Sequence, residues 1–337
     1  MSAPPQGFRR LALLTAVATF VLIIVGGVVR VSDSGLGCGP EGSGFHGWPF
    51  CNGDVAPGVD LNSIVEYTHR VVAGAVGLMM LALAVWAWRR LRAHRRLVQA
   101  TAAGFVLVVA QALLGGATVE EGLEEALVAA HLGLAMLLLA LLIYVWRSSR
   151  PELIGAPPAD GGPRFRGLAV ATSVAVLATI VAGGYMAGTQ NYGRPDYQLG
   201  DGAHHACGKQ FPTCNGEFMP FGRARLVDIH LTHRAFMYVT AALALALVAL
   251  ALRRRPSAGV VRTAKLLALV LALQILVGAL NVWLDEYEAL IVVHLLLGTL
   301  LWAASVGLTL QLFRVPEPAG SPARAGARGA GREAVTA

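Results

Sequence analysis

The chain has 337 residues, of which 55% are hydrophobic and only 14% are charged, and its formal net charge is +7. Soluble globular proteins carry about 25% charged residues, so these values exclude an ordinary water-soluble domain and indicate an integral membrane protein. The basic residues gather between apolar runs, a distribution that reflects membrane topology rather than binding to nucleic acid.

Eight apolar stretches are each close to the roughly 20 residues that a helix needs to cross a bilayer. They are predicted to be membrane-spanning helices at residues 11–30, 64–88, 98–118, 125–146, 167–187, 226–252, 263–283 and 289–313. Arginine-rich loops follow the second, fourth and sixth of them. Because arginine and lysine concentrate on the cytoplasmic side, we expect both termini in the cytoplasm and loops 31–63 and 188–225 outside. The sequence therefore predicts a multi-pass protein of the cell membrane.

The second half of the chain repeats the first. The sequence QALLG at 111–115 matches QILVG at 274–278, and PFCNG at 49–53 matches PTCNG at 212–216. An even number of spans separates the two copies, so the copies have the same orientation in the membrane. The predicted fold is all-α, with two tandem pseudo-symmetric four-helix bundles.

The division of the chain follows from this repeat. We expect an N-terminal bundle at 9–147, a cytoplasmic linker at 148–164, a C-terminal bundle at 165–314 and a tail at 315–337. The linker is rich in Pro, Gly and Ala, as a boundary segment is. The tail consists largely of Ala, Gly and Arg without aromatic residues, a composition typical of disorder.

Four histidines lie within the predicted spans: His69, His131, His233 and His294. Each comes from the second or fourth helix of its half and lies at a common depth, about 10 Å from the outer end of its helix. Facing histidines on two helices of a bundle can provide both axial ligands of a haem. The alternative is four hydrogen-bonded core histidines. Zinc is disfavoured, because each half offers two histidines without further ligands at fixed spacing.

The sequence EYTHR at 66–70 recurs as HLTHR at 230–234, so Glu66 has no acidic counterpart. Glu66 and His69 are three residues apart and share one helix face. An ionisable residue at membrane depth indicates a function. A carboxylate can stabilise positive charge or accept a proton while a neighbouring group is oxidised. The alternative is a salt bridge between Glu66 and Arg70 at the mouth of the helix.

Two arginines directly follow histidines of this set, Arg70 and Arg234. The forked guanidinium donors suit carboxylates such as the propionates of a haem. A snorkelling arginine at the membrane interface is the equally weighted alternative.

The four cysteines form two pairs in the outer loops. Because the outside of a bacterial cell is oxidising, we expect the disulfides Cys38–Cys51 and Cys207–Cys214, with free thiols as the alternative. Three histidines of these loops are expected to be solvated rather than ligating: His46, His204 and His205.

These motifs together resemble the haem A synthase family of membrane enzymes over about residues 9 to 314. The resemblance implies a substrate haem O bound by His69 and His131, and a haem b bound by His233 and His294. It implies an oxidoreductase that oxidises the C8 methyl group of haem O to a formyl group. Two hydroxylations and loss of water lead to haem A for terminal oxidases, with water as the oxygen source. Glu66 is then the catalytic residue.

The resemblance also bears on partners and on the first cysteine pair. It implies haem O as the substrate, haem O synthase and oxidase assembly factors as partners, and an electron acceptor that the motifs do not identify. It allows Cys38 and Cys51 a role in electron or thiol exchange. The wider spacing of this pair, with 41–48 as an apparent insertion, favours a plain loop staple instead.

Two other functions are compatible with the repeated histidines. One is a di-haem b-type membrane electron carrier, and the other is a haem transporter or chaperone. Glu66 occurs beside only one of the two histidine pairs, and a carrier needs no such asymmetry. The sequence therefore favours the enzyme.

Overall fold

The computed structural model describes residues 3–189, 202–284 and 287–319. Over these residues the chain forms long helices: α1 Gln6–Val31, α2 Leu61–Arg90, α3 Arg95–Glu120, α4 Glu125–Ser148, α5 Gly162–Gly188, α6 Arg225–Arg254, α7 Ala258–Trp283 and α8 Glu288–Gln311. Three short 3-10 helices lie in the loops: η1 Gly44–His46, η2 Pro151–Leu153 and η3 Ala203–Cys207. Within these described ranges there is no β-strand, only isolated bridges.

Eight helices of the described part are long and apolar enough to cross a membrane. This confirms the predicted spans, and the chain is an all-helical, multi-pass membrane protein. Most helices extend a few residues beyond the apolar runs, because polar residues form their first and last turns. At the start of α2, for example, the Asp60 side chain accepts a hydrogen bond from the Ser63 backbone N–H at 3.0 Å and caps the helix.

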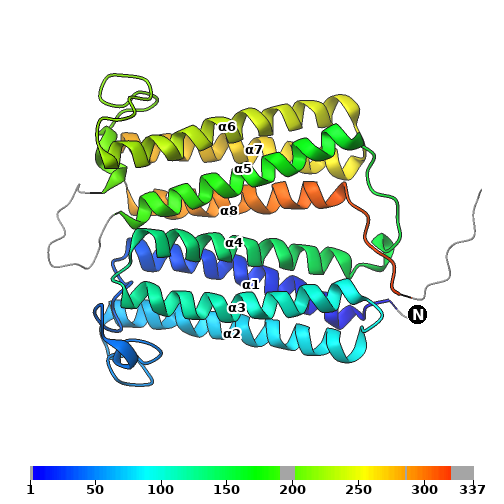
Figure 1. The fold of residues 1–337 in the computed structure, drawn as a ribbon, viewed down its shortest axis with the longest axis horizontal. Helices are drawn as coiled ribbons and strands as arrows, with labels where there is room; N and C mark the ends of the chain where they lie inside the picture. Colours follow the sequence, from blue (N-terminus) through cyan, green and yellow to red (C-terminus); the bar gives the residue numbers. More distant parts are fainter. Residues whose placement is uncertain (1–2, 190–201, 285–286, 320–337) are drawn as a thin grey trace, which may run out of the picture.

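The helices pack in two groups, α1–α4 and α5–α8, which lie on opposite sides of the molecule in Figure 1. In each group every helix contacts the next one in the chain, and the first helix contacts the fourth. The second and fourth helices therefore occupy opposite corners of a ring. The groups meet through α1, α4, α5 and α8. The loops that contain the cysteines lie at the end opposite the N-terminus (Figure 1).

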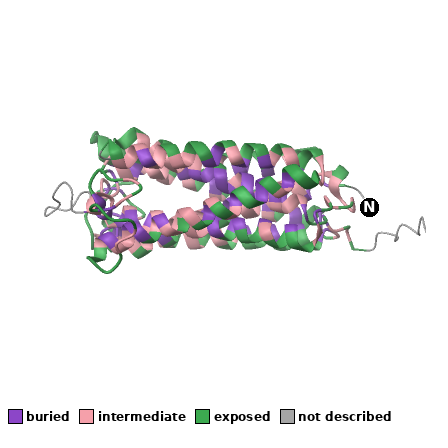
Figure 2. Ribbon diagram, turned by 90° about the horizontal axis from the view of Figure 1, so that it is seen from above, coloured by how far each residue is buried: buried purple, intermediate pink, exposed green. Residues whose placement is uncertain are grey.

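Residues coloured as buried lie mainly on the inward-facing sides of the helices, and exposed residues lie on the outer sides (Figure 2). One hydrophobic cluster includes residues of α4 together with residues of α5 to α8, so the contact between the two groups is part of the core. Large apolar side chains are also exposed on the outside, among them Leu14, Val106 and Leu269. Such side chains are expected where the surface faces lipid, and they agree with the membrane-spanning interpretation.

The connection between α4 and α5 is hydrogen-bonded to the segment that follows α8. The Gly155 N–H donates to the Val315 carbonyl at 3.0 Å, and Arg314 donates to the Gly155 carbonyl at 3.1 Å. The Ala159 N–H donates to the Gln311 carbonyl at 3.0 Å. Of the tail that we expect to be disordered, residues 315–319 are described, and residues 320–337 lie outside the described residues.

A tryptophan links the two groups of helices and can be tested. Trp302 of α8 is buried, and its indole N–H donates to the Met136 carbonyl of α4 at 2.8 Å. We expect Trp302→Phe to lower the free energy of unfolding by about 1 kcal/mol, because this hydrogen bond is lost. The measurement is the midpoint of SDS-induced unfolding. Trp88→Phe, at an exposed position of α2, is the matched control and should leave the midpoint unchanged. Equal shifts in both variants would contradict the proposed role of the bond.

Candidate functional site

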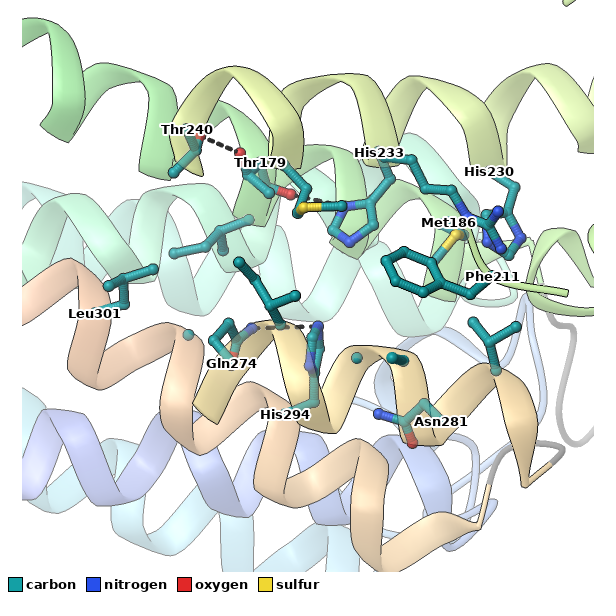
Figure 3. A pocket seen from close by; sticks show the side chains of 18 of the residues that line it. Thr179, Met186, Phe211, His230, His233, Thr240, Gln274, Asn281, His294 and Leu301 are labelled. Carbon is teal, nitrogen blue, oxygen red and sulfur yellow. Dashed lines mark hydrogen bonds between the residues drawn. The ribbon is translucent and has the colours of Figure 1, made fainter. Parts of the chain in front are cut away.

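A pocket lies among the helices of the second group (Figure 3). It contains about 1050 Å³ of space not filled by protein atoms, part of it open to the outside, and it is lined mainly by apolar side chains with a few polar groups. This is the character of pockets that bind large organic ligands. His233 of α6 and His294 of α8 enter it from opposite sides (Figure 3). The structure thus brings this predicted pair of histidines together at one pocket.

The hydrogen bond of His233 determines which of its ring nitrogens is free to bind a ligand. Its Nδ1 lies 3.0 Å from the Thr179 carbonyl of α5. Because a carbonyl only accepts, Nδ1 carries the proton and Nε2 carries the lone pair. A metal-binding histidine is usually oriented in this way, with one nitrogen donating to a backbone acceptor and the other free for the metal.

His294 has a different partner but the same protonation. The amide nitrogen of Gln274 in α7 lies 3.2 Å from His294 Nε2. Because an amide N–H₂ group only donates, Nε2 is the acceptor and carries the lone pair. Two further polar atoms of this region are buried without a hydrogen-bond partner, His294 Nδ1 and Gln274 Oε1. His233 therefore offers a free Nε2 lone pair at the pocket, whereas the Nε2 lone pair of His294 accepts a hydrogen bond from the Gln274 amide.

The other predicted pair, His69 of α2 and His131 of α4, lies on opposite corners of the first group of helices. Both Nδ1 atoms are buried and have no hydrogen-bond partner. A buried polar group without a partner is costly and needs an explanation. Gln111, the counterpart of Gln274, does not reach the imidazole and donates instead to the His131 carbonyl at 3.0 Å.

All four imidazoles lie against a glycine of the preceding helix. A Cβ atom added at Gly26 or Gly115 would lie 3.2 Å from Cε1 of His69 or His131, respectively. At both positions the missing side chain leaves room for the ring.

The second half repeats this contact more tightly. A Cβ atom added at Gly183 or Gly278 would lie 2.9 Å from Cε1 of His233 or His294, respectively. The donor set, the pocket and these glycine contacts fit a flat group held between two neutral imidazoles. Among the residues that the structure describes, no three His, Cys, Asp or Glu gather as they would around a bare metal ion.

Glu66 lies in the first turns of α2 and is buried. Its Oε2 accepts a hydrogen bond from the Cys38 backbone N–H at 2.8 Å, and its Oε1 pairs with Arg70. Its counterpart His230 is also hydrogen-bonded to a loop, but as the donor: its Nδ1 lies 2.8 Å from the Ala203 carbonyl. The salt bridge expected as an alternative for Glu66 is therefore present, and it leaves the carboxylate buried beside the first outer loop.

The two arginines hold the outer loops. Arg70 donates to the carbonyls of Gly47 and Phe50 at 2.7 and 2.8 Å. Buried Arg234 donates to the carbonyls of Thr213 and Gln210 at 2.9 and 2.8 Å, and its guanidinium lies 5.4 Å from the ring centroid of Phe211. The alternative that Arg234 extends its charged group to the membrane interface is wrong, because its side chain is buried under the loop.

Both predicted disulfides are present, Cys38–Cys51 and Cys207–Cys214. In each loop the second cysteine also forms an isolated antiparallel bridge with the residue three positions later, Asp54 or Glu217. The repeated PxCNG sequence thus has one conformation in both loops, and the disulfides confirm the expected loop staples.

Sequence reasoning missed several residues of the pocket, notably His204, Phe211, Met186 and Asn281. His204 was expected to be solvated, but it lines the pocket from η3, and burial lowers its pKa well below the usual range. The repeat offered a signal for Phe211, because an aromatic residue, Trp48 in the first loop, precedes the repeated proline in both loops. No comparable signal marked the other positions.

Fold and site together define a multi-pass helical membrane protein in which two half-buried histidines, His233 and His294, from opposite corners of a helix ring line a mainly apolar pocket. The chain matches the cytochrome oxidase assembly protein family, COX15-CtaA, over residues 9–306. It belongs to this family.

Several curated relatives are named "Heme A synthase". The protein from Alkalihalophilus pseudofirmus is 28% identical over 309 residues, which cover 90% of this chain and 96% of the relative. The protein from Halalkalibacterium halodurans is 31% identical over 223 residues, or 66% of this chain and 68% of the relative. A Bacillus licheniformis relative is 34% identical over 145 residues, 41% of this chain and 46% of the relative.

The contacts of Arg234 generate a prediction about the loop over the pocket. We expect Arg234→Gln to loosen residues 208–216, because a glutamine has too few donors to replace the hydrogen bonds to Gln210 and Thr213. Hydrogen–deuterium exchange of that segment should become about tenfold faster or more, since bonds to charged donors contribute most to local stability.

The matched control is Arg223→Gln, in an exposed ion pair with Glu217 of the same loop. It should leave the exchange of residues 208–216 close to that of the unsubstituted protein, since exposed ion pairs contribute little. Unchanged exchange in Arg234→Gln would show that the arginine does not hold the loop.

Proposed function

We propose that this protein synthesises haem A by oxidising the C8 methyl group of haem O to a formyl group. One observation carries the proposal: two histidine pairs are held in matched positions, and only one of them has a buried carboxylate, Glu66, on the same helix. The names of the relatives and the family support it. Oxidation of a methyl group to an aldehyde makes the protein an oxidoreductase, with water as the oxygen source.

The two pairs have different tasks in this proposal. His69 and His131 bind the substrate haem O in the first half, and His233 and His294 bind a haem b in the second half. The presence of both histidines at one pocket and the free Nε2 lone pair of His233 support the latter assignment. When bound there, haem b supplies a one-electron redox centre. The pocket around it is lined mainly by apolar side chains.

Glu66 is the residue proposed for catalysis. Removing electrons from a methyl group builds positive charge on its carbon and releases protons. A carboxylate fixed by Arg70 and by the Cys38 N–H can stabilise that charge or take up a proton without reorganising. The matching position 230 holds a histidine bonded to the Ala203 carbonyl, and a neutral imidazole has no negative charge with which to stabilise a developing cation. This asymmetry favours the enzyme over a di-haem electron carrier or a haem transporter.

Arg70 and Arg234 are predicted to bind the haem propionates, and we keep this role only for the N–H groups that do not hold the outer loops. Arg70 and Arg234 stand next to ligand candidates in the sequence, and each carries N–H groups beyond those that hold the loops. We propose that these remaining donors meet the haem propionates. In that arrangement each arginine joins an outer loop to the ligand beneath it.

We further propose that the two groups of helices are tandem copies of one four-helix bundle, at 9–147 and 165–314, joined by linker 148–164. The repeated glycine–histidine contacts and the matching cysteine loops support this duplication. The arginine-rich loops support cytoplasmic termini, with Glu66 and the cysteine loops on the extracytoplasmic side of the cell membrane. Interaction with haem O synthase and with oxidase assembly factors stays a prediction for experiment.

The catalytic assignment can be tested by Glu66→Gln. The amide keeps the shape of the side chain but cannot accept a proton, so we expect haem A formation to fall about 100-fold or more while haem b is retained. The measurement is the haem composition of membranes supplied with haem O, by pyridine haemochrome spectra. Glu121→Gln, at an exposed position after α3, is the control and should give normal haem A. Normal haem A from Glu66→Gln would refute the assignment.

The division of labour between the halves predicts a second outcome. His233→Ala or His294→Ala should remove haem b from the purified protein, because each variant lacks one of the two proposed axial ligands. His46→Ala, in the exposed part of the first loop, is the control and should keep the full haem-to-protein ratio. Full retention of haem b in both pocket variants would mean that the cofactor is bound elsewhere.

A further inference from the structure

Two glycine pairs, Gly26-Gly27 in α1 and Gly183-Gly184 in α5, lie in helices where the two groups of helices meet. Neighbouring residues of an α-helix point about 100° apart. One glycine of a pair can therefore face a helix of its own half while the next one faces the other half. The contacts of the two pairs follow this arrangement.

The first glycine of each pair contacts a histidine of its own half. Gly26 lies against the ring of His69, and Gly183 lies against the ring of His233. In both cases the ring atom nearest to an added Cβ is Cε1, the carbon between the two nitrogens. A side chain at either glycine would displace the imidazole itself.

The second glycine of each pair contacts a leucine of the other half, and that leucine directly follows a histidine in the sequence. An added Cβ at Gly27 would collide with Cδ2 of Leu295, the neighbour of His294. An added Cβ at Gly184 would lie 3.0 Å from Cδ2 of Leu132, the neighbour of His131. The glycine pair of each half thus touches histidine-bearing helices of both halves.

The leucines have limited freedom to move aside. Leu132 and Leu295 are partly buried and pack against the large hydrophobic cluster formed by residues of α1 and of α4 to α8. Packed interiors respond to added volume by shifts of side chains and backbone, because they contain few voids. A methyl group at Gly27 would therefore displace the Leu295 side chain, the direct neighbour of His294 in α8, although Gly27 belongs to the other half of the chain.

We propose that each glycine pair is a shared support that positions two histidines, one of its own half and one of the other. Gly26-Gly27 supports His69 and His294, and Gly183-Gly184 supports His233 and His131. The four glycines are positioning residues that act through the imidazoles. The inference rests on the proposed haem-binding function of these histidines, and it couples the geometry of the two haem sites.

The decisive variant is Gly27→Ala, because it acts across the two halves. It should shift the low-spin electron paramagnetic resonance signal and the midpoint potential of the haem b at His233 and His294. Retention of haem b should weaken about tenfold, as expected for one methyl group forced into a packed contact. Gly74→Ala in α2 and Gly167→Ala in α5 are matched controls, because an added Cβ at either glycine meets nothing within 4 Å.

Rescue separates positioning from general destabilisation. The double variant Gly27→Ala with Leu295→Ala removes the colliding side chain and should restore the signal and the potential toward those of the unsubstituted protein. A merely destabilising effect would instead add to that of Leu295→Ala. The equivalent test on the first half is Gly184→Ala with Leu132→Ala, read from the haem bound between His69 and His131. It gives an independent result if Gly27→Ala fails to fold.

The outcomes distinguish this inference from the function on which it rests. If unsubstituted protein binds no haem through His233 and His294, the proposed function fails. If it binds haem there, but Gly27→Ala gives the same signal, potential and retention as Gly74→Ala, the shared support is refuted. A shift that Leu295→Ala does not reverse would also overturn it.

Discussion

An imidazole within a membrane must find partners for its nitrogens inside the protein, because lipid offers none. Four imidazoles in this chain are subject to that constraint at matched positions. His233 satisfies one nitrogen with the Thr179 carbonyl and keeps the other for the pocket. His69 and His131 have buried Nδ1 atoms without a partner. Helices, loops and glycines are arranged around these rings, and the chemistry proposed for the protein depends on where their lone pairs point.

The matched positions 66 and 230 show how one scaffold can serve two tasks. Both side chains are buried near the start of a helix, and both are hydrogen-bonded to the outer loop above. A carboxylate only accepts, so Glu66 takes a hydrogen bond from a loop N–H. An imidazole can donate, so His230 binds a loop carbonyl instead. A single difference in donor character thus leaves one loop attached through an acid and the other through a base.

Much of the fold could be predicted from the sequence, because a membrane-spanning helix is recognised by its length and its apolar composition. The cysteine pairs and the meeting of His233 and His294 at one pocket were also predictable, since both depend on a repeat visible in the residues. The loop contacts of Arg234 and the place of His204 were not, because they depend on how an irregular loop folds back over the helix ends. The contacts of the glycine pairs also could not be predicted, because small residues in a membrane helix are equally compatible with ordinary helix packing.

The position of α8 has a consequence for how the molecule is made. This helix contacts α1, α4, α5 and α7, and the segment after it is hydrogen-bonded to the connection between the halves. It also leaves the ribosome after α1 to α7. Chains are synthesised from the N-terminus, and early segments begin to fold before later ones emerge. The first four helices are therefore inserted in the bilayer with one flank uncovered until α8 is inserted against them.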